Sequence, residues 1–148
     1  MAPHDPFISI RAGYALQDLA RRKGLKTGKV AKMTSLAHNT VLRAFDGTPT
    51  IHLKSILRVA EALGASLSFR LIREGQTRRV NLPCAPQELQ DLFLENSATV
   101  PRVAQAMEST NVTIYKALKR PEDVTVETLY RIFMTLGYWP YLEVQENL

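Results

Sequence analysis

Apolar residues recur at intervals of three and four along most of this chain, in runs separated by glycine, proline and small polar residues. Such spacing predicts amphipathic helices. The first series of predicted helices covers residues 14–23, 28–34, 38–46 and 53–63. A second series covers residues 87–96, 100–107, 111–119 and 126–136. We expect Thr27 to cap helix 28–34 and Gly47 to end helix 38–46, because threonine and glycine favour those positions.

Four short strands are predicted, the first two of them from an alternation of apolar and polar residues. They cover residues 7–11, 66–73, 77–82 and 138–145. Residues 74–76 form a turn between the second and third strands, and Pro83 ends the third. An isolated hairpin is only marginally stable. We therefore expect the strands to join in one small sheet between two helical halves, or in a sheet shared between chains.

The two helical series repeat each other at an offset of 73 residues. The sequence LQDL occurs at 16–19 and again at 89–92, and the same offset makes 11 of the 54 positions from 16 to 69 identical. Two helical stretches that merely share a common pattern are the weaker explanation, because the alignment holds without a gap. We therefore predict a duplicated unit, with one module at residues 1–75 and another at residues 76–148.

Charge divides along nearly the same line. Residues 1–82 hold 14 Lys/Arg and 5 Asp/Glu, a net charge of +9, whereas residues 83–148 hold 5 and 9, a net charge of −4. The basic half suits a polyanion such as nucleic acid, although basic surfaces also serve solubility alone. The single cysteine, Cys84, fits a reducing compartment. Without a membrane-length apolar run or a signal-like N-terminus, we expect a cytoplasmic protein, associated with the nucleoid when bound to DNA.

Residues 14–65 resemble the Xre or Cro-like family of lambda-repressor-type DNA-binding domains. The matching residues lie in helices 28–34 and 38–46, in the turn between them and in the following helix: Val30, Ala31, Leu36, Val41, Ala44, Phe45, Asp46, Gly47, Leu53, Ile56, Ala60, Leu63 and Gly64. Ser35 stands where the family usually has glycine. The resemblance implies a mainly α fold with short β-strands, built as two tandem lambda-repressor-like four-helix helix-turn-helix modules joined by a small β-sheet.

In this family the start of the third helix, here residues 38–46, enters the major groove of DNA. The residues placed to contact base edges are His38, Asn39, Thr40, Leu42 and Arg43. Asparagine pairs with adenine and arginine with guanine, whereas local capping of the helix is an alternative role for Asn39 and Thr40. The residues placed along the phosphate backbone are Thr27, Gly28, Lys29, Lys32, Thr48, Thr50 and His52.

Residues 87–142 resemble the same fold less closely, and residues 98–144 are also loosely similar to the DNA-binding antidote proteins of toxin–antitoxin pairs. A possible second set of base readers lies in the third helix of this half: Asn111, Thr113, Lys116 and Lys119. Docking like the first half would bring Glu108, Glu122 and Asp123 close to phosphates, which repel them. The charge therefore favours dimerisation, scaffolding or partner binding for this half, with DNA reading as the other possibility.

The resemblance implies a sequence-specific DNA-binding transcriptional regulator that acts as a repressor on double-stranded DNA. If only the first half reads DNA, we expect a homodimer on inverted repeats; if both halves read it, one chain covers an asymmetric pair of half-sites. The alternative function is that of an antitoxin or antiactivator that works mainly by binding a protein partner.

The sequence gives no indication of an enzyme. The histidines His4, His38 and His52 are scattered and Cys84 stands alone, so no metal site is predicted. A Gly-rich phosphate loop and a nucleophile elbow are both missing from the sequence. We expect no catalytic residue, no metal, no cofactor and no membrane partner.

Overall fold

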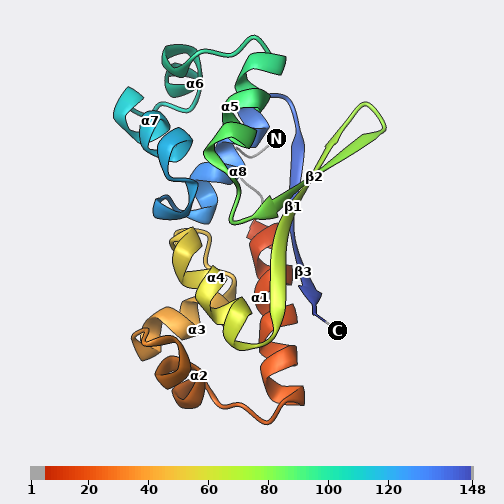
Figure 1. Cartoon of the computed structure of the whole chain (residues 1–148), viewed down its shortest axis with the longest axis vertical. Helices are drawn as coiled ribbons and strands as arrows, with labels where there is room; N and C mark the ends of the chain where they lie inside the picture. The colour runs from red at the N-terminus through yellow and green to blue at the C-terminus, as the bar shows by residue number, and fades with distance from the viewer. Residues whose placement is uncertain (1–5, 148) are drawn as a thin grey trace.

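Two groups of four α-helices lie at opposite ends of a small sheet in the computed structural model, which describes residues 6–147 (Figure 1). The first group comprises α1 (Pro6–Arg22), α2 (Thr27–Thr34), α3 (His38–Asp46) and α4 (Leu53–Ala62). The second comprises α5 (Pro86–Glu95), α6 (Val100–Ala106), α7 (Asn111–Lys119), the 3-10 helix η1 (Pro121–Asp123) and α8 (Val126–Thr135). The strands are β1 (Ala65–Arg73), β2 (Gln76–Leu82) and β3 (Trp139–Glu146). The expected mainly α fold with short strands is confirmed.

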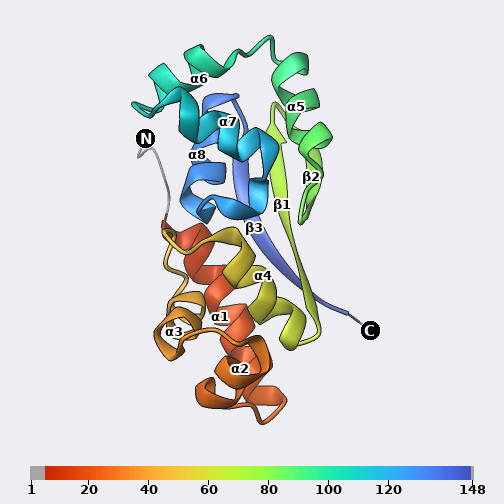
Figure 2. The ribbon, with the colours of Figure 1, turned by 60° about the vertical axis from the view of Figure 1, so that its left-hand side comes forward.

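The sheet has the strand order β2-β1-β3, and both pairs of neighbours are antiparallel. Strands β1 and β2 form a hairpin whose two turn residues, Glu74 and Gly75, have φ angles of 50° and 78°. Two consecutive residues with positive φ give the turn a backbone twist that matches the twist of the flanking strands. Strand β3 pairs with the other edge of β1, and both strands run from one helical group to the other (Figure 2). The sheet that joins the two groups therefore forms within one chain.

The strand predicted at residues 7–11 is wrong, because α1 is already helical from Pro6. Proline is tolerated in the first turn of a helix, so Pro6 is compatible with this start. The buried residues Ala12, Leu16 and Leu19 continue with helical spacing, and five alternating residues before them cannot distinguish a strand from a helix. The other predicted bounds of helices and strands differ from the observed ones by one residue at most, whereas η1 was not predicted.

The same elements recur along the chain at the offset of 73 residues. Helices α3 and α7 differ by 73 at both ends, and so do α4 and α8. Special backbone conformations recur as well. The turns before α3 and α7 contain Ser35 and Glu108, with φ of 58° and 54°, and Gly64 and Gly137 both have positive φ. The two halves of the chain therefore share backbone detail as well as element order.

Backbone hydrogen bonds join the starts of α4 and α8 in a reciprocal manner. The Leu53 N–H donates to the carbonyl of Val124 at 2.9 Å, and the Val126 N–H donates to the carbonyl of Ile51 at 3.0 Å. Adding 73 to Ile51 gives Val124, and adding 73 to Leu53 gives Val126. Each bond is thus the counterpart of the other.

Two further pairs join residues that are themselves 73 apart. His52 and Thr125 form an antiparallel bridge between the two reciprocal hydrogen bonds. In the sheet, Phe69 of β1 lies opposite Leu142 of β3. Contacts of this kind place corresponding positions of the two halves face to face, at both the helical and the sheet side of the molecule.

One hydrophobic core extends through both helical groups and the sheet. Phe69 on β1 and Phe133 on α8 are fully buried and pack edge to face, with ring centroids 5.1 Å apart. Because β1 is also covered by α4, the strand contributes to the packing of both groups. The two halves therefore depend on one another for burial of apolar surface.

Cys84 follows β2 and is only 5% exposed. Burial raises the pKa of its thiol from 9.0 to about 11. Because the thiolate is the reactive form, we expect iodoacetamide at pH 8 to modify the native protein at least about tenfold more slowly than the guanidinium-unfolded chain. Mass spectrometry of timed aliquots measures the modification, and equal rates for the native and unfolded protein would contradict the burial.

The raised pKa of Cys84 also makes stability depend on pH. Since the folded state holds the thiol proton more tightly than the unfolded chain, the free energy of unfolding should fall as the pH rises above about 9.

Candidate nucleic-acid interface

Helices α2 and α3 form a packed pair with a tight turn between them. Val30 and Val41 are fully buried on their facing sides. Thr34, at the end of α2, donates its hydroxyl to the Val30 carbonyl at 2.8 Å and accepts the Leu36 N–H at 3.4 Å. Ser35 takes the left-handed conformation that reverses the chain. These hydrogen bonds hold the turn between α2 and α3. They do not involve the outer face of α3.

Helix α1 supports the end of α3 through a close backbone contact. A Cβ atom added at Gly13 would lie 2.5 Å from the backbone nitrogen of Gly47 and 2.6 Å from the carbonyl oxygen of Phe45. Only glycine fits such an approach without displacement of the backbone. As expected, Gly47 ends α3, with φ of 69°. The position of α3 is therefore fixed from behind by α1.

The outer face of α3 carries the residues predicted to contact bases. His38, Asn39 and Arg43 are exposed, Leu42 is 38% exposed and Thr40 is half-buried. The alternative role of Asn39 and Thr40 as local caps is wrong, because the N-cap of α3 is Ala37 and no side chain makes a cap hydrogen bond there. The polar side chains at the start of α3 therefore have no capping role to explain them.

Arg43 is held by a residue from the loop that follows α3. Its Nη2 donates to Thr50 Oγ1 at 2.8 Å. The sequence predicted a base contact for Arg43 and a phosphate contact for Thr50, but it did not indicate that the two side chains meet. A guanidinium group has five N–H donors, so this bond leaves donors for a base and limits the directions in which the side chain points.

The start of α2 offers the second part of the site. A surface hollow there is lined by Arg21, Lys26 and Thr27, and Gly28 and Lys29 are exposed beside it. The expected capping by Thr27 is wrong, because the extended residue Lys26 is the N-cap and no side chain caps the helix. Basic residues around uncapped helical amides form a favourable place for a phosphate.

The other residues predicted at the phosphate backbone surround α3 and the start of α4. Lys32, Thr50 and His52 are exposed, and Thr48 is half-buried. His52 is also the N-cap of α4 and takes part in the bridge to Thr125, so its backbone lies where the two halves meet. The predicted contact residues of the first half thus occupy α2, α3 and the loop between α3 and α4.

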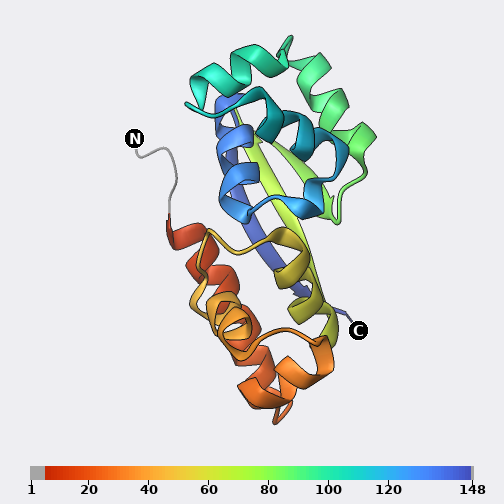
Figure 3. The same cartoon turned by 90° about the vertical axis from the view of Figure 1, so that its left-hand side faces the viewer.

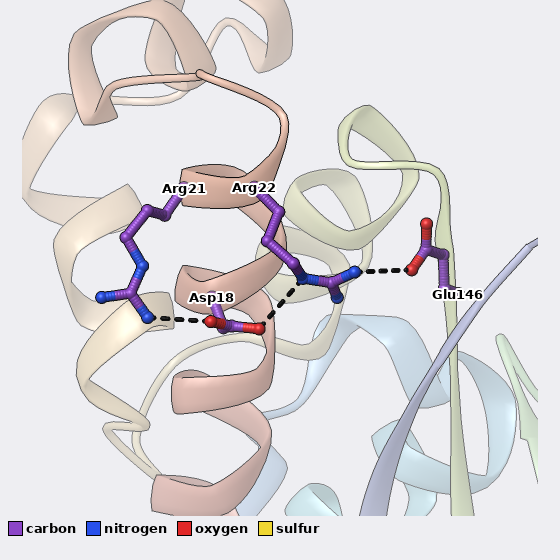
Figure 4. A network of polar contacts seen from close by, with 4 residues as sticks. All are labelled: Asp18, Arg21, Arg22 and Glu146. Atoms are coloured by element: carbon purple, nitrogen blue, oxygen red, sulfur yellow. Dashed lines mark hydrogen bonds and ion pairs between the residues drawn. The ribbon is translucent and has the colours of Figure 1, made fainter.

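Arg21 and Lys26 are additions that the sequence did not single out for binding, although their signal was present in the basic run on either side of Gly24. Arg21 is held by Asp18, whose carboxylate accepts hydrogen bonds from Arg21 at 2.8 Å and from Arg22 at 3.0 Å (Figure 4). These bonds, the one from Arg21 first, lower the pKa of Asp18 below its usual 3.8. Arg22 also donates to Glu146 of β3 at 3.3 Å, which ties the end of α1 to the sheet.

Ion pairs between the two halves account for part of the charge asymmetry seen in the sequence. Within residues 6–147, at least four acidic residues of the acidic half (83–148) pair with cations of the basic half (1–82). These pairs are Glu95 with Arg78, Asp123 with Lys54 at 3.5 Å, Glu143 with Arg70 and Arg79 at 3.2 Å each, and Glu146 with Arg22 at 3.3 Å. None of them uses Lys26, Lys29 or Arg43. The cations beside α2 and α3 are therefore separate from those that join the halves.

The second half has the same helices with different surface chemistry. Among its predicted base readers, Asn111, Lys116 and Lys119 are exposed, whereas Thr113 is half-buried and its hydroxyl lies 3.1 Å from that of Thr110. Thr110 also caps α7, and Thr99 and Thr125 cap α6 and α8. Val112 and Tyr115 on α7 are 75% and 58% exposed. Side chains thus cap helices here whose first-half counterparts are uncapped.

Neither a metal site nor a membrane span is seen in residues 6–147. Groups of three or more possible metal-ligating side chains do not occur among these residues, and His4 lies outside them. In the same range, every helix is too short or too polar to cross a bilayer.

The surface formed by α3, the start of α2 and the loop after α3 is the best-formed candidate site, and it combines exposed polar groups with basic residues. Neither a protein-family model nor any of the curated proteins or solved structures compared with this chain matches it.

Proposed function

We propose that this protein is a sequence-specific DNA-binding transcriptional regulator that acts as a repressor. Residues 1–75 form a helix-turn-helix module of the lambda-repressor type and residues 76–148 a second module of the same kind. The observation that carries this proposal is the outer face of α3, where His38, Asn39 and Arg43 are exposed on a helix held from behind by α1.

In the proposed complex the start of α3 enters the major groove. Asn39 pairs with an adenine and Arg43 with a guanine, and Leu42 contacts a thymine methyl group. Thr50 directs Arg43 through its hydrogen bond. A phosphate occupies the start of α2, where the helical amides, Lys26 and Lys29 neutralise its charge. Repression follows because a protein bound at a promoter excludes other proteins from the same DNA.

Selection from a pool of duplexes with a random centre of about 30 base pairs, followed by mobility shift, tests this function. We expect the wild type to enrich a defined sequence and to bind it less tightly as salt increases. Asn39→Ala and Arg43→Ala should each weaken binding to that sequence by roughly 5- to 150-fold and should leave the circular dichroism spectrum unchanged.

Arg11→Ala is the matched control. Arg11 is an exposed arginine on α1 that lies beside Tyr141 and Val144 of β3, away from α3. The control removes the same charge as Arg43→Ala but should change the affinity for the selected duplex by less than about twofold. If the wild type enriches no sequence and shows no salt-dependent binding to duplex DNA, the proposed function is wrong.

The second candidate function is an antitoxin or antiactivator that binds a protein partner. Exposed apolar residues of the second half favour it: Leu94 and Val112 are 75% exposed and Tyr115 is 58% exposed. A partner-binding protein would lose its partner on substitution of these residues and would show no sequence preference on DNA. The selection experiment therefore separates the two candidates.

A further inference from the structure

We propose that α7 reads a second half-site that differs in sequence from the one read by α3, so that a single chain binds one asymmetric operator. This inference rests on the proposed function of α3 and extends it to the second half. It replaces the homodimer expected from the sequence with a pair of recognition helices in the same chain.

The backbone contacts between the halves indicate an approximate two-fold axis. A two-fold rotation that exchanges the halves must exchange the hydrogen bonds Leu53–Val124 and Val126–Ile51, and these bonds have nearly equal lengths of 2.9 and 3.0 Å. Residues on the axis must face their own counterparts, as His52 does with Thr125.

The sheet obeys the same relation. Phe69 lies opposite its counterpart, Leu142, while Leu67 lies opposite Val144 and Leu71 opposite Pro140. Subtracting 73 from Val144 gives position 71, and subtracting 73 from Pro140 gives position 67. The axis therefore runs from the centre of the sheet to the bridge between α4 and α8. Two chains of a symmetric dimer would make contacts of this kind across their interface.

The axis places both third helices on one side of the molecule. Figure 1 shows α3 and α7 on the side away from the sheet, one in each helical group, and Figure 3 shows both on the side turned toward the viewer. Paired recognition helices arranged about a two-fold axis meet successive major grooves on one side of a duplex, about 34 Å apart. In this chain the required pairing is present without a second copy.

The exposed residues of α7 suit bases different from those read by α3. Val112 occupies the position of Asn39, so an apolar contact with a thymine methyl replaces a bidentate pair with adenine. Tyr115 occupies the position of Leu42. The exposed Lys116 corresponds to Arg43 and keeps a cation able to contact guanine. The large apolar side chains exposed on α7 would thus contact bases in the major groove. Because these side chains differ from those of α3, the two half-sites must differ in sequence.

One of the three acidic residues expected near DNA in the second half is already paired with a cation. Asp123 is paired with Lys54 of the first half at 3.5 Å. Exposed cations on α6 and α7, Arg102, Lys116 and Lys119, lie on the helices that correspond to α2 and α3. Local charge on this face is therefore compatible with a phosphate backbone even though the second half is acidic as a whole.

The test uses the full chain and the same random duplex pool. We expect the selected sequence to contain two unlike blocks whose centres are about 10 base pairs apart, and we expect native mass spectrometry to find one chain per duplex. Arg43→Ala should relax the base preference in one block only. Val112→Ala and Lys116→Ala should relax it in the other, with affinity reduced about tenfold.

A variant that gives α7 the outer face of α3 makes the test sharper. Asn111→His, Val112→Asn, Tyr115→Leu and Lys116→Arg together replace four exposed residues, so the fold should persist. This variant should select an inverted repeat of the α3 block, still with one chain per duplex.

Two results would overturn the inference and leave the function of α3 intact. One is a wild-type selection with a single block, or with two chains per duplex, that responds to Arg43→Ala but not to the α7 variants. The other is an unchanged selected sequence for the fourfold variant. Either result would show that α7 does not read a half-site. Loss of all selection would instead overturn the proposed function itself.

Discussion

Gly13→Ala is expected to lower the midpoint of thermal unfolding by about 6–12 °C, which corresponds to about 3 kcal/mol or more. The added methyl group would lie within 2.8 Å of three backbone atoms: the nitrogen and Cα of Gly47 and the carbonyl oxygen of Phe45. Backbone at the end of a helix cannot move aside as a flexible side chain does. Either α1 separates from α3 or α3 tilts, and both outcomes should also weaken the proposed binding to DNA.

Gly28→Ala is the matched control for this loss of stability. Gly28 lies in α2, and a Cβ atom there would have no neighbour within 4 Å. Alanine in a helix is favoured over glycine by about 0.5–1 kcal/mol, so the control should keep or slightly raise the unfolding midpoint. Circular dichroism at 222 nm measures both variants, and a Gly13→Ala protein as stable as the wild type would contradict the close contact between α1 and α3.

Phe133→Ala is expected to destabilise both helical groups together, by about 3–5 kcal/mol. Phe133 is fully buried on α8, and its ring packs edge to face on Phe69 of β1. Truncation leaves a cavity at the strand that both groups share. We therefore expect a single unfolding transition with a lower midpoint, and hydrogen exchange of α1–α4 amides should accelerate as much as that of α5–α8.

Tyr14→Ala is the control for loss of an aromatic ring, because Tyr14 is 64% exposed and its removal should change stability by less than about 0.5 kcal/mol. A double-mutant cycle that combines Phe133→Ala with Phe69→Ala measures the coupling free energy between the Phe133 and Phe69 rings. We expect it to be about 0.5–1.5 kcal/mol. Two separate transitions in Phe133→Ala, with the first half unaffected, would show that the halves fold independently.

Local patterns in the sequence were sufficient to locate nearly every helix and strand. Helix α3 was predicted to the residue because apolar spacing, a turn and Gly47 all act within a few positions of one another. The hairpin turn at Glu74 and Gly75 was equally local. The start of α1 was missed because a short alternating run before Ala12 satisfies both the helical and the strand pattern.

Contacts between distant parts of the chain could not be predicted in the same way. The marginal stability of an isolated hairpin suggested that strands from the two halves meet, but the reciprocal hydrogen bonds of Leu53 and Val126 depend on how the halves pack. The approach of Gly13 to Gly47 and the bond from Arg43 to Thr50 likewise join elements that no sequence pattern links. These contacts set the position of α3 and the direction of its arginine.

Charge was the least direct guide. The excess of acid after residue 82 suggested that the second half avoids DNA, yet Glu143 and Glu146 pair with arginines of the first half. Part of the asymmetry therefore reflects attraction between the halves. In the proposed complex the cations beside α2 and α3 are the ones that meet DNA, and only the folded chain separates them from the cations that pair with the second half.

Binding to the selected duplex with methylated bases tests most directly whether α3 lies in the major groove. A methyl group on N7 of guanine projects into the major groove and blocks the acceptor that Arg43 requires. We expect methylation of at least one guanine in the α3 block to abolish the mobility shift of the wild type, and methylation of adenine N3, in the minor groove, to have little effect. A duplex that binds equally well with every guanine N7 methylated, or that loses binding only through minor-groove methylation, would contradict the proposed docking of α3.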